Sequence, residues 1–131
     1  MSKIAEFLGE AGVFYLATVD GDQPQLRPLG LFIEDEEGVV RFGIGDFKAV
    51  TQQLRANPKC QIVSCKGIDW LRYTGGAVFE DDPKYVEAAL TKMPNLREIY
   101  NEETGNKMMT FHLEDATAVN IPVMGEGENM L

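Results

Sequence analysis

The stretch QLRPLGLFIEDEEGVVRFGIG, residues 25–45, holds two apolar segments separated by an acidic turn. Alternate side chains of an extended strand point to the same face. Leu29, Leu31 and Ile33 therefore share one face of the first segment, and Arg27 falls in line with them. A guanidinium on a face of core residues needs a reason, and the rest of the chain has to supply it.

The sequence on either side predicts strands with inserted helices. Residues 13–19, 25–34 and 39–45 are expected to form a three-strand meander. Further strands are predicted at residues 60–65, 70–79, 108–113 and 116–123, the last two joined by a Glu-Asp turn. A helix capped by Ser2 is expected at the N-terminus, another follows Asp82-Pro83, and residues 94–100 form a short helical piece.

The helix within residues 46–58 has the clearest pattern. Asp46 is the expected N-cap, Phe47, Val50 and Leu54 share one face, and Pro58 stops the helix. A glycine pair at residues 75–76 indicates a bulge or bend.

These elements favour one domain over residues 1–131, with residues 124–131 as a loose tail. The predicted fold is mainly β, an antiparallel six- to seven-stranded split β-barrel with inserted helices.

Composition restricts the partners. The chain has 12 Lys and Arg against 21 Asp and Glu, a net charge of −9, which argues against nucleic acid or an anionic membrane. No apolar run approaches the roughly 20 residues that cross a bilayer. Cys60 and Cys65 lie an odd number of residues apart in one strand, so they face opposite ways and a disulfide is not expected. We expect a cytoplasmic protein.

Lys48 is a second cation in an unusual position, because it opens a helix whose start carries positive partial charge. An anion bound there explains both Lys48 and Arg27, since a lysine, an arginine fork and free N–H groups form a phosphate receptor. Two structural explanations stay open. Arg27 can extend from a strand end into solvent, and Lys48 can pair with Asp46 or point outwards.

Residues 26–63, including Arg27-Pro28, Lys48, Leu54 and Asn57-Pro58, resemble the pyridoxamine 5′-phosphate oxidase-like, FMN-binding split-barrel family. The run DWLRYTGGAVFEDD, residues 69–82, is similar to a later strand of that family. The likeness covers about residues 13–121. It is closest to the small nitroimidazole-resistance-like branch.

The resemblance implies an FMN-binding flavoprotein, an oxidoreductase that passes hydride or electrons to a small soluble substrate. It also implies a homodimer with FMN at the subunit interface. Arg27 and Lys48 would hold the FMN phosphate, and Trp70 would approach the flavin of the partner chain or pack in the interface or the core. The cofactor-binding residues implied are Arg27, Pro28, Leu29, Gly30, Phe42, Gly43, Ile44, Gly45, Phe47, Lys48 and Trp70.

Two departures from the family pattern keep alternatives open. The run GIGDFK has Asp46 and Phe47 where relatives have Thr or Ser, and Asp46 repels a phosphate unless it faces away to cap the helix. The Arg-x-His substrate motif is missing, so true pyridoxamine phosphate oxidation is not expected. His112 has no carboxylate at a useful spacing, and no metal site or catalytic residue is predicted. The alternatives are a non-catalytic flavin, haem or deazaflavin carrier, or a dimer with a vestigial site.

Overall fold

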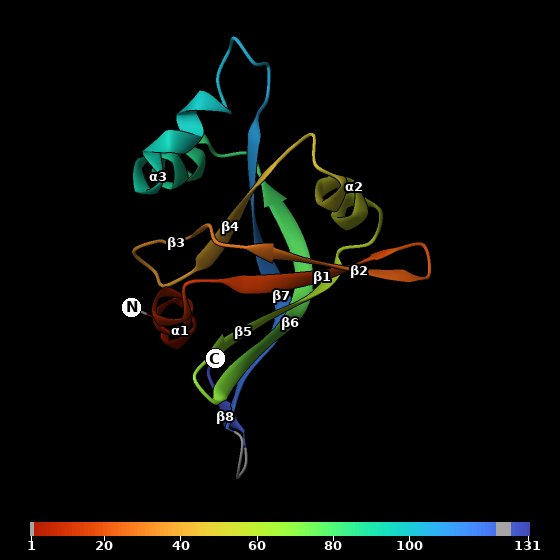
Figure 1. Cartoon of the computed structure of the whole chain (residues 1–131), viewed down its shortest axis with the longest axis vertical. Coiled ribbons are helices and arrows are strands. Elements are labelled where there is room, and N and C mark those ends of the chain that lie inside the picture. The colour runs from red at the N-terminus through yellow and green to blue at the C-terminus, as the bar shows by residue number, and fades with distance from the viewer. Residues whose placement is uncertain (1, 123–126) are drawn as a thin grey trace.

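The fold is one curled antiparallel sheet with helices packed around it (Figure 1). The computed structural model describes residues 2–122 and 127–131. The helices are α1 (Lys3–Ala11), α2 (Ala49–Ala56), α3 (Pro83–Lys92) and the 3₁₀ helix η1 (Pro94–Glu98). The strands are β1 (Phe14–Asp20), β2 (Gln23–Leu29), β3 (Phe32–Glu34), β4 (Val40–Gly45), β5 (Lys59–Lys66), β6 (Asp69–Glu80), β7 (Met108–Ile121) and β8 (Glu128–Asn129). Their order, β2-β1-β5-β6-β7-β4-β3 with β8 on β7, confirms the predicted split barrel.

The opening stretch does not form a single strand. It breaks at Gly30 into β2, which pairs with β1, and β3, which pairs with β4 at the other end of the sheet order. The predicted meander is therefore wrong. The apolar alternation gave no sign of this break, because Leu31 and Ile33 are still buried after it. Since β2 and β4 belong to opposite ends of the sheet, the chain between them spans the split of the barrel.

The inner face of the sheet carries the larger hydrophobic core, which α1 and α2 cover. Phe42 is fully buried between Phe14 and Phe111, with ring centroids 5.3 and 5.4 Å away. Truncating such a buried ring to alanine typically costs about 3–5 kcal/mol. A second, smaller cluster lies under α3 on the opposite face and includes Leu31, Ile33, Leu90 and Met108.

Strands β6 and β7 bend together at a bulge. Their register shifts between Thr74 and Gly76, and Asp115 has a φ of +50°. A Cβ on Gly75 would lie 2.9 Å from the carbonyl oxygen of Glu114, so only glycine fits. The predicted turn between two C-terminal strands is thus a bulge inside one strand, β7. Gly75 was correctly predicted as part of a bend.

Helix α2 begins two residues later than predicted. Its N-cap is Lys48, whereas the Asp46 carboxylate accepts a hydrogen bond from the Lys107 N–H at 3.2 Å. The Phe47 side chain is 49% exposed, although Val50 and Leu54 are buried as expected. Both corrections have one cause: residues 46–47 form a turn, so the helical spacing starts only at Ala49.

The remaining elements follow the predicted order. Asp82 caps α3 by accepting a hydrogen bond from the Lys84 N–H, and η1 matches the short helical piece. In the predicted loose tail, residues 124–126 lie outside the described residues, while Glu128–Asn129 pair with β7 as β8. None of the helices in the described part of the chain has the length and apolarity needed to span a membrane.

Candidate functional site

A cleft of about 440 Å³ opens where the end of β2 meets the end of β4 and the start of α2. This volume is within the range typical of small-molecule sites. The cleft lies at the split of the barrel, the place where the two ends of the sheet approach without pairing. Its lining consists of Arg27, Pro28, Leu29, Gly43, Ile44, Gly45, Lys48, Ala49, Val50 and Tyr100.

Arg27 is held in position by neutral groups only. Its Nη1 donates to Thr18 Oγ1 at 2.8 Å and to the Leu16 carbonyl at 3.1 Å, and its Nη2 donates to Gln53 Oε1 at 2.7 Å. Thr18 also donates to Gln53 at 2.6 Å, which fixes the acceptor. Burial lowers the pKa of Arg27, and no carboxylate within the described residues lies within 4 Å to offset this. The guanidinium is therefore oriented but lacks a counter-charge.

Lys48 brings a second positive charge to the same cleft. As the N-cap of α2 it has extended backbone, and its side chain makes no capping hydrogen bond. The N–H groups of Ala49 and Val50 belong to the first turn of the helix, which has no intrahelical acceptors for them. Helix start, lysine and arginine together favour an anion at this end of the cleft.

Gly45 forms a narrow wall beside the helix start. A Cβ at this position would lie 2.8 Å from Phe47 Cε1 and 2.9 Å from the Tyr100 hydroxyl. The Gly45 carbonyl accepts a hydrogen bond of 2.6 Å from Thr51 Oγ1, which ties β4 to α2. Burial, followed by the charge of Asp46, raises the pKa of Tyr100. The wall therefore consists of the Gly45 backbone and the Tyr100 side chain, with Phe47 packed behind them.

The cleft gathers seven of the eleven residues implied by the resemblance. Gly30 is exposed where strand β2 ends, and Phe42 is fully buried in the core. Phe47 packs on Tyr100 with centroids 6.2 Å apart, so it lies behind the wall at Gly45. Trp70 lies near the start of β6, outside this cleft.

The two side chains that hold Arg27 were not predicted from the sequence. Thr18 and Gln53 orient Arg27, yet each follows an ordinary strand or helix pattern, so no signal identified them. Tyr100 comes from the loop after η1 and could be placed only by the tertiary structure.

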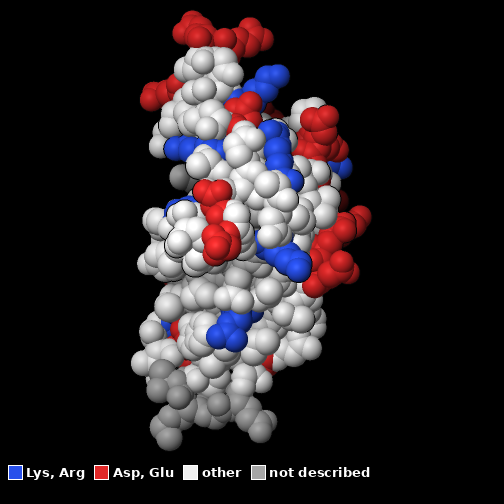
Figure 2. Space-filling view, turned by 90° about the vertical axis from the view of Figure 1, so that its right-hand side faces the viewer, with Lys and Arg blue, Asp and Glu red and all other residues white. Residues whose placement is uncertain are grey.

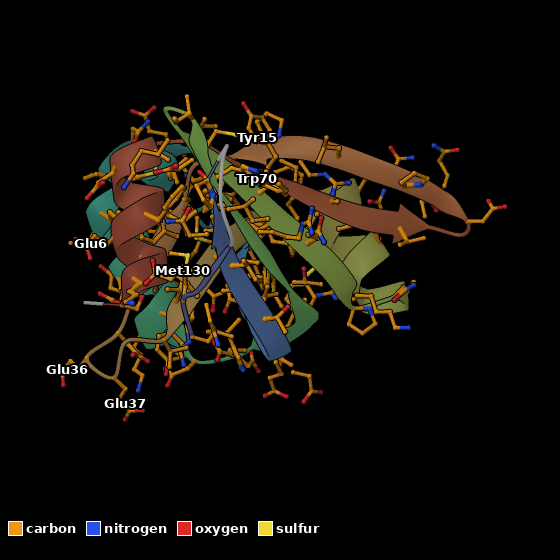
Figure 3. The ribbon with its side chains drawn as sticks, turned by 90° about the horizontal axis from the view of Figure 1, so that it is seen from below. Glu6, Tyr15, Glu36, Glu37, Trp70 and Met130 are labelled. Carbon is orange, nitrogen blue, oxygen red and sulfur yellow. The ribbon has the colours of Figure 1, made fainter. Side chains whose placement is uncertain are left out.

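Trp70 is part of an outer sheet face that α3 does not cover. The register aligns Pro28, Tyr15, Val63, Arg72 and Val119 in one row, and Cys65, Trp70 and Ile121 in another. Tyr15 and Trp70 lie on the same side of the molecule (Figure 3). In Figure 2 the charged side chains gather in the upper part of the surface, and the lower part carries few.

His112 has carboxylates on both sides, which the sequence did not predict. Its Nδ1 lies 2.6 Å from Glu80 Oε1 and its Nε2 lies 3.1 Å from Glu114 Oε1. Glu80 comes from β6 and is far from His112 in sequence, so only strand pairing brings the two together. The expectation of no nearby carboxylate is wrong, but this group lies outside the cleft.

Comparison with known proteins places this geometry in context. The sequence matches the family model of pyridoxamine 5′-phosphate oxidase over residues 1–120. A NimC/NimA family protein from Clostridium acetobutylicum is 32% identical, with a TM-score of 0.86 over 98% of this chain and 89% of that one. Curated proteins give no match.

Two more distant structures share the fold. A pyridoxamine 5′-phosphate oxidase-related, FMN-binding protein from Nostoc punctiforme is 16% identical, with a TM-score of 0.69 over 96% of this chain and 85% of that one. A heme binding protein from Mycobacterium smegmatis is 13% identical, with a TM-score of 0.68 over 94% of this chain and 54% of that one.

Proposed function

We propose that this chain, which belongs to the pyridoxamine 5′-phosphate oxidase family, is an FMN-binding oxidoreductase that acts on a small soluble substrate. The observation that carries the proposal is the cleft itself. Arg27 and Lys48 both line it, and neither has a carboxylate within 4 Å in the part of the chain that the structure describes. Two cations without counter-charges beside a helix start fit a phosphate.

The residues of the cleft fit FMN. Arg27, Lys48 and the N–H groups of Ala49 and Val50 would hold its phosphate, and the glycine-lined end of β4 would admit the ring. The Asp46 carboxylate accepts from the Lys107 N–H, and Asp46 is not among the residues that line the cleft, although its charge is felt at Tyr100. Bound FMN supplies hydride and electron transfer. The protein contributes phosphate anchoring, a slot for the ring and exclusion of water.

Flavin is favoured over haem by the position of His112. This histidine, the only one in the sequence, sits between Glu80 and Glu114 and does not line the cleft. Haem usually takes a His, Cys, Met or Tyr ligand to iron. Of the lining residues only Tyr100 belongs to that set.

The outer sheet face supports a homodimer, and a free cysteine on it is in keeping with the cytoplasm. Tyr15 and Val63 pair across β1 and β5, Arg72 separates Val63 from Val119, and Trp70 and Ile121 extend the patch in the next row. A second copy would cover this face and bring its Trp70 toward the cleft. Cys65 is a free, exposed thiol beside Trp70, which suits a reducing compartment.

Flavin titration tests the cofactor assignment. We expect the purified protein to retain FMN after dialysis and to be reduced by NADH or NADPH. The double variant Arg27→Gln/Lys48→Gln should bind FMN at least about a hundredfold more weakly, because two charge-assisted contacts are lost. Arg55→Gln/Lys59→Gln, which removes two exposed cations outside the cleft, is the matched control. Equal FMN affinity in the two double variants would sink the assignment of Arg27 and Lys48 to the phosphate, and a wild type that fails to hold FMN would favour a different ligand or a vestigial site.

Sedimentation tests the dimer separately. Val63→Glu/Trp70→Glu should give a monomer, because each copy would bury two carboxylates next to a single cation, Arg72. Ile99→Glu, at an exposed apolar position after η1, should leave the dimer intact. A wild-type monomer at micromolar concentration would refute the assembly.

A further inference from the structure

A second cavity, of about 650 Å³, adjoins the cleft and shares Tyr100 with it. It lies between α3, the end of β6 and the segment that leads from η1 into β7, in the upper part of Figure 1. Because one side chain belongs to both linings, a molecule in this cavity would lie beside whatever fills the cleft.

The floor of the cavity is apolar and adaptable. Val86, Leu90, Met108 and Met109 contribute to it, and most of its surface is apolar. Methionine fills irregular gaps and makes favourable contacts with aromatic rings. Thr110, on the same face of β7 as Met108, is fully buried with a hydroxyl that has no hydrogen-bond partner among the described residues.

The rim of the cavity is acidic. Its carboxylates belong to Glu80, Asp81, Asp82, Glu87 and Glu102, against the one cation of Lys107. Three of the five have protein partners, namely Glu80 with Arg41, Asp82 with Lys84 and Glu87 with Arg97. Asp81 and Glu102 have no cation within 4 Å in the described part of the chain. These two carboxylates leave negative charge over an apolar floor.

We infer that this cavity binds an amphipathic organic cation, an aromatic or alkyl ammonium. The apolar part would lie on Met108, Met109 and Leu90, and the ammonium would face Asp81 and Glu102. The ring of Tyr100 adds a surface that attracts cations. Binding stands on the cavity alone, whereas the role of this cation as the substrate beside FMN rests on the proposed function.

Methionine-methyl NMR of the full chain tests the inference, because Met108 and Met109 are reporters in the floor. The probes are benzylammonium, the nearly isosteric neutral benzyl alcohol, and phenylacetate as the anion. Benzylammonium should shift both methyl signals saturably and bind about tenfold more tightly than either other probe. Asp81→Asn/Glu102→Gln should remove that preference. Glu36→Gln/Glu37→Gln, a charge-matched control at the turn between β3 and β4 (Figure 3), should keep it.

Several results would overturn the inference. Equal affinity for benzyl alcohol and benzylammonium would show an apolar cavity without charge selection. Unshifted methionine signals would show that the cavity is no site for this class. The same samples are titrated with FMN, so that loss of benzylammonium binding and loss of FMN binding are measured separately.

Discussion

Two arginines on this sheet serve opposite purposes. Arg41 on β4 is buried beneath Tyr85, with its guanidinium 3.7 Å from the ring centroid, and it pairs with Glu80 at 2.6 Å and with Asp35. Arg27 on β2 has only the neutral partners Thr18, Gln53 and a carbonyl. The protein balances the first charge with two carboxylates and surrounds the second with neutral groups only.

The pKa shifts of the two arginines express the same difference. Burial lowers the pKa of Arg41, but hydrogen bonds with Glu80 and then Asp35 outweigh it, so the pKa is raised overall. Burial lowers the pKa of Arg27, and nothing offsets it. A bound phosphate would provide the offset that Arg41 already has.

Removing Arg41 should have the largest effect on stability. Arg41→Gln leaves Glu80 and Asp35 partly buried without their cation, and breaking such a pair costs about 3–5 kcal/mol. Urea unfolding measures the loss, with the exposed Arg55→Gln as control, for which a change below about 0.5 kcal/mol is expected. Similar losses in both variants would remove the distinction between the arginines.

Removing Arg27 should reverse the pattern. Arg27→Gln should cost about 1.5–3 kcal/mol of stability, because the lost hydrogen bonds have a charged donor but leave no carboxylate unpaired. The same variant should weaken FMN binding about 10–100-fold, as expected for hydrogen bonds to a charged group. Arg27→Lys keeps the charge without the planar fork and should recover part of the affinity, measured by quenching of FMN fluorescence. Full affinity in Arg27→Gln would mean that Arg27 serves the fold.

The sequence was informative about Arg27 and silent about Arg41. Arg27 interrupts an apolar alternation, and that conflict marked it. Arg41 occupies an expected outward position on β4, so its burial under α3 and its pairing with Glu80 depend on tertiary packing. The order of elements followed from local patterns. The break at Gly30 did not follow from them, because apolar and polar residues keep alternating where the chain crosses from β2 to β3. The continuity of β7 did not follow either, because the residues of its bulge resemble those of a turn.

A smaller effect is expected from the residue that orients Arg27. Gln53→Ala removes the acceptor for Arg27 Nη2 and for the Thr18 hydroxyl. With Arg27 retained but free to move, FMN affinity should fall about fivefold, the equivalent of one neutral hydrogen bond. Gln52→Ala, which alters the neighbouring exposed residue on α2, is the control. A drop as large as that of Arg27→Gln would show that Gln53 itself contacts the ligand.

The smallest effect is expected in how the free energy of unfolding falls at acidic pH. Hydrogen bonds from Arg41 and from the Val39 N–H hold the pKa of Asp35 below its ordinary value of 3.8. A depressed pKa contributes stability that is complete above the unfolded value and is lost as pH falls through the folded one. Wild type should therefore lose more stability than Asp35→Asn between pH 5 and a pH below about 3.8. Urea unfolding at both pH values measures this, with Asp22→Asn in the exposed turn between β1 and β2 as control. Equal slopes for wild type and Asp35→Asn would mean that Glu80 alone balances Arg41, and the contrast with Arg27 would then rest on a single ion pair.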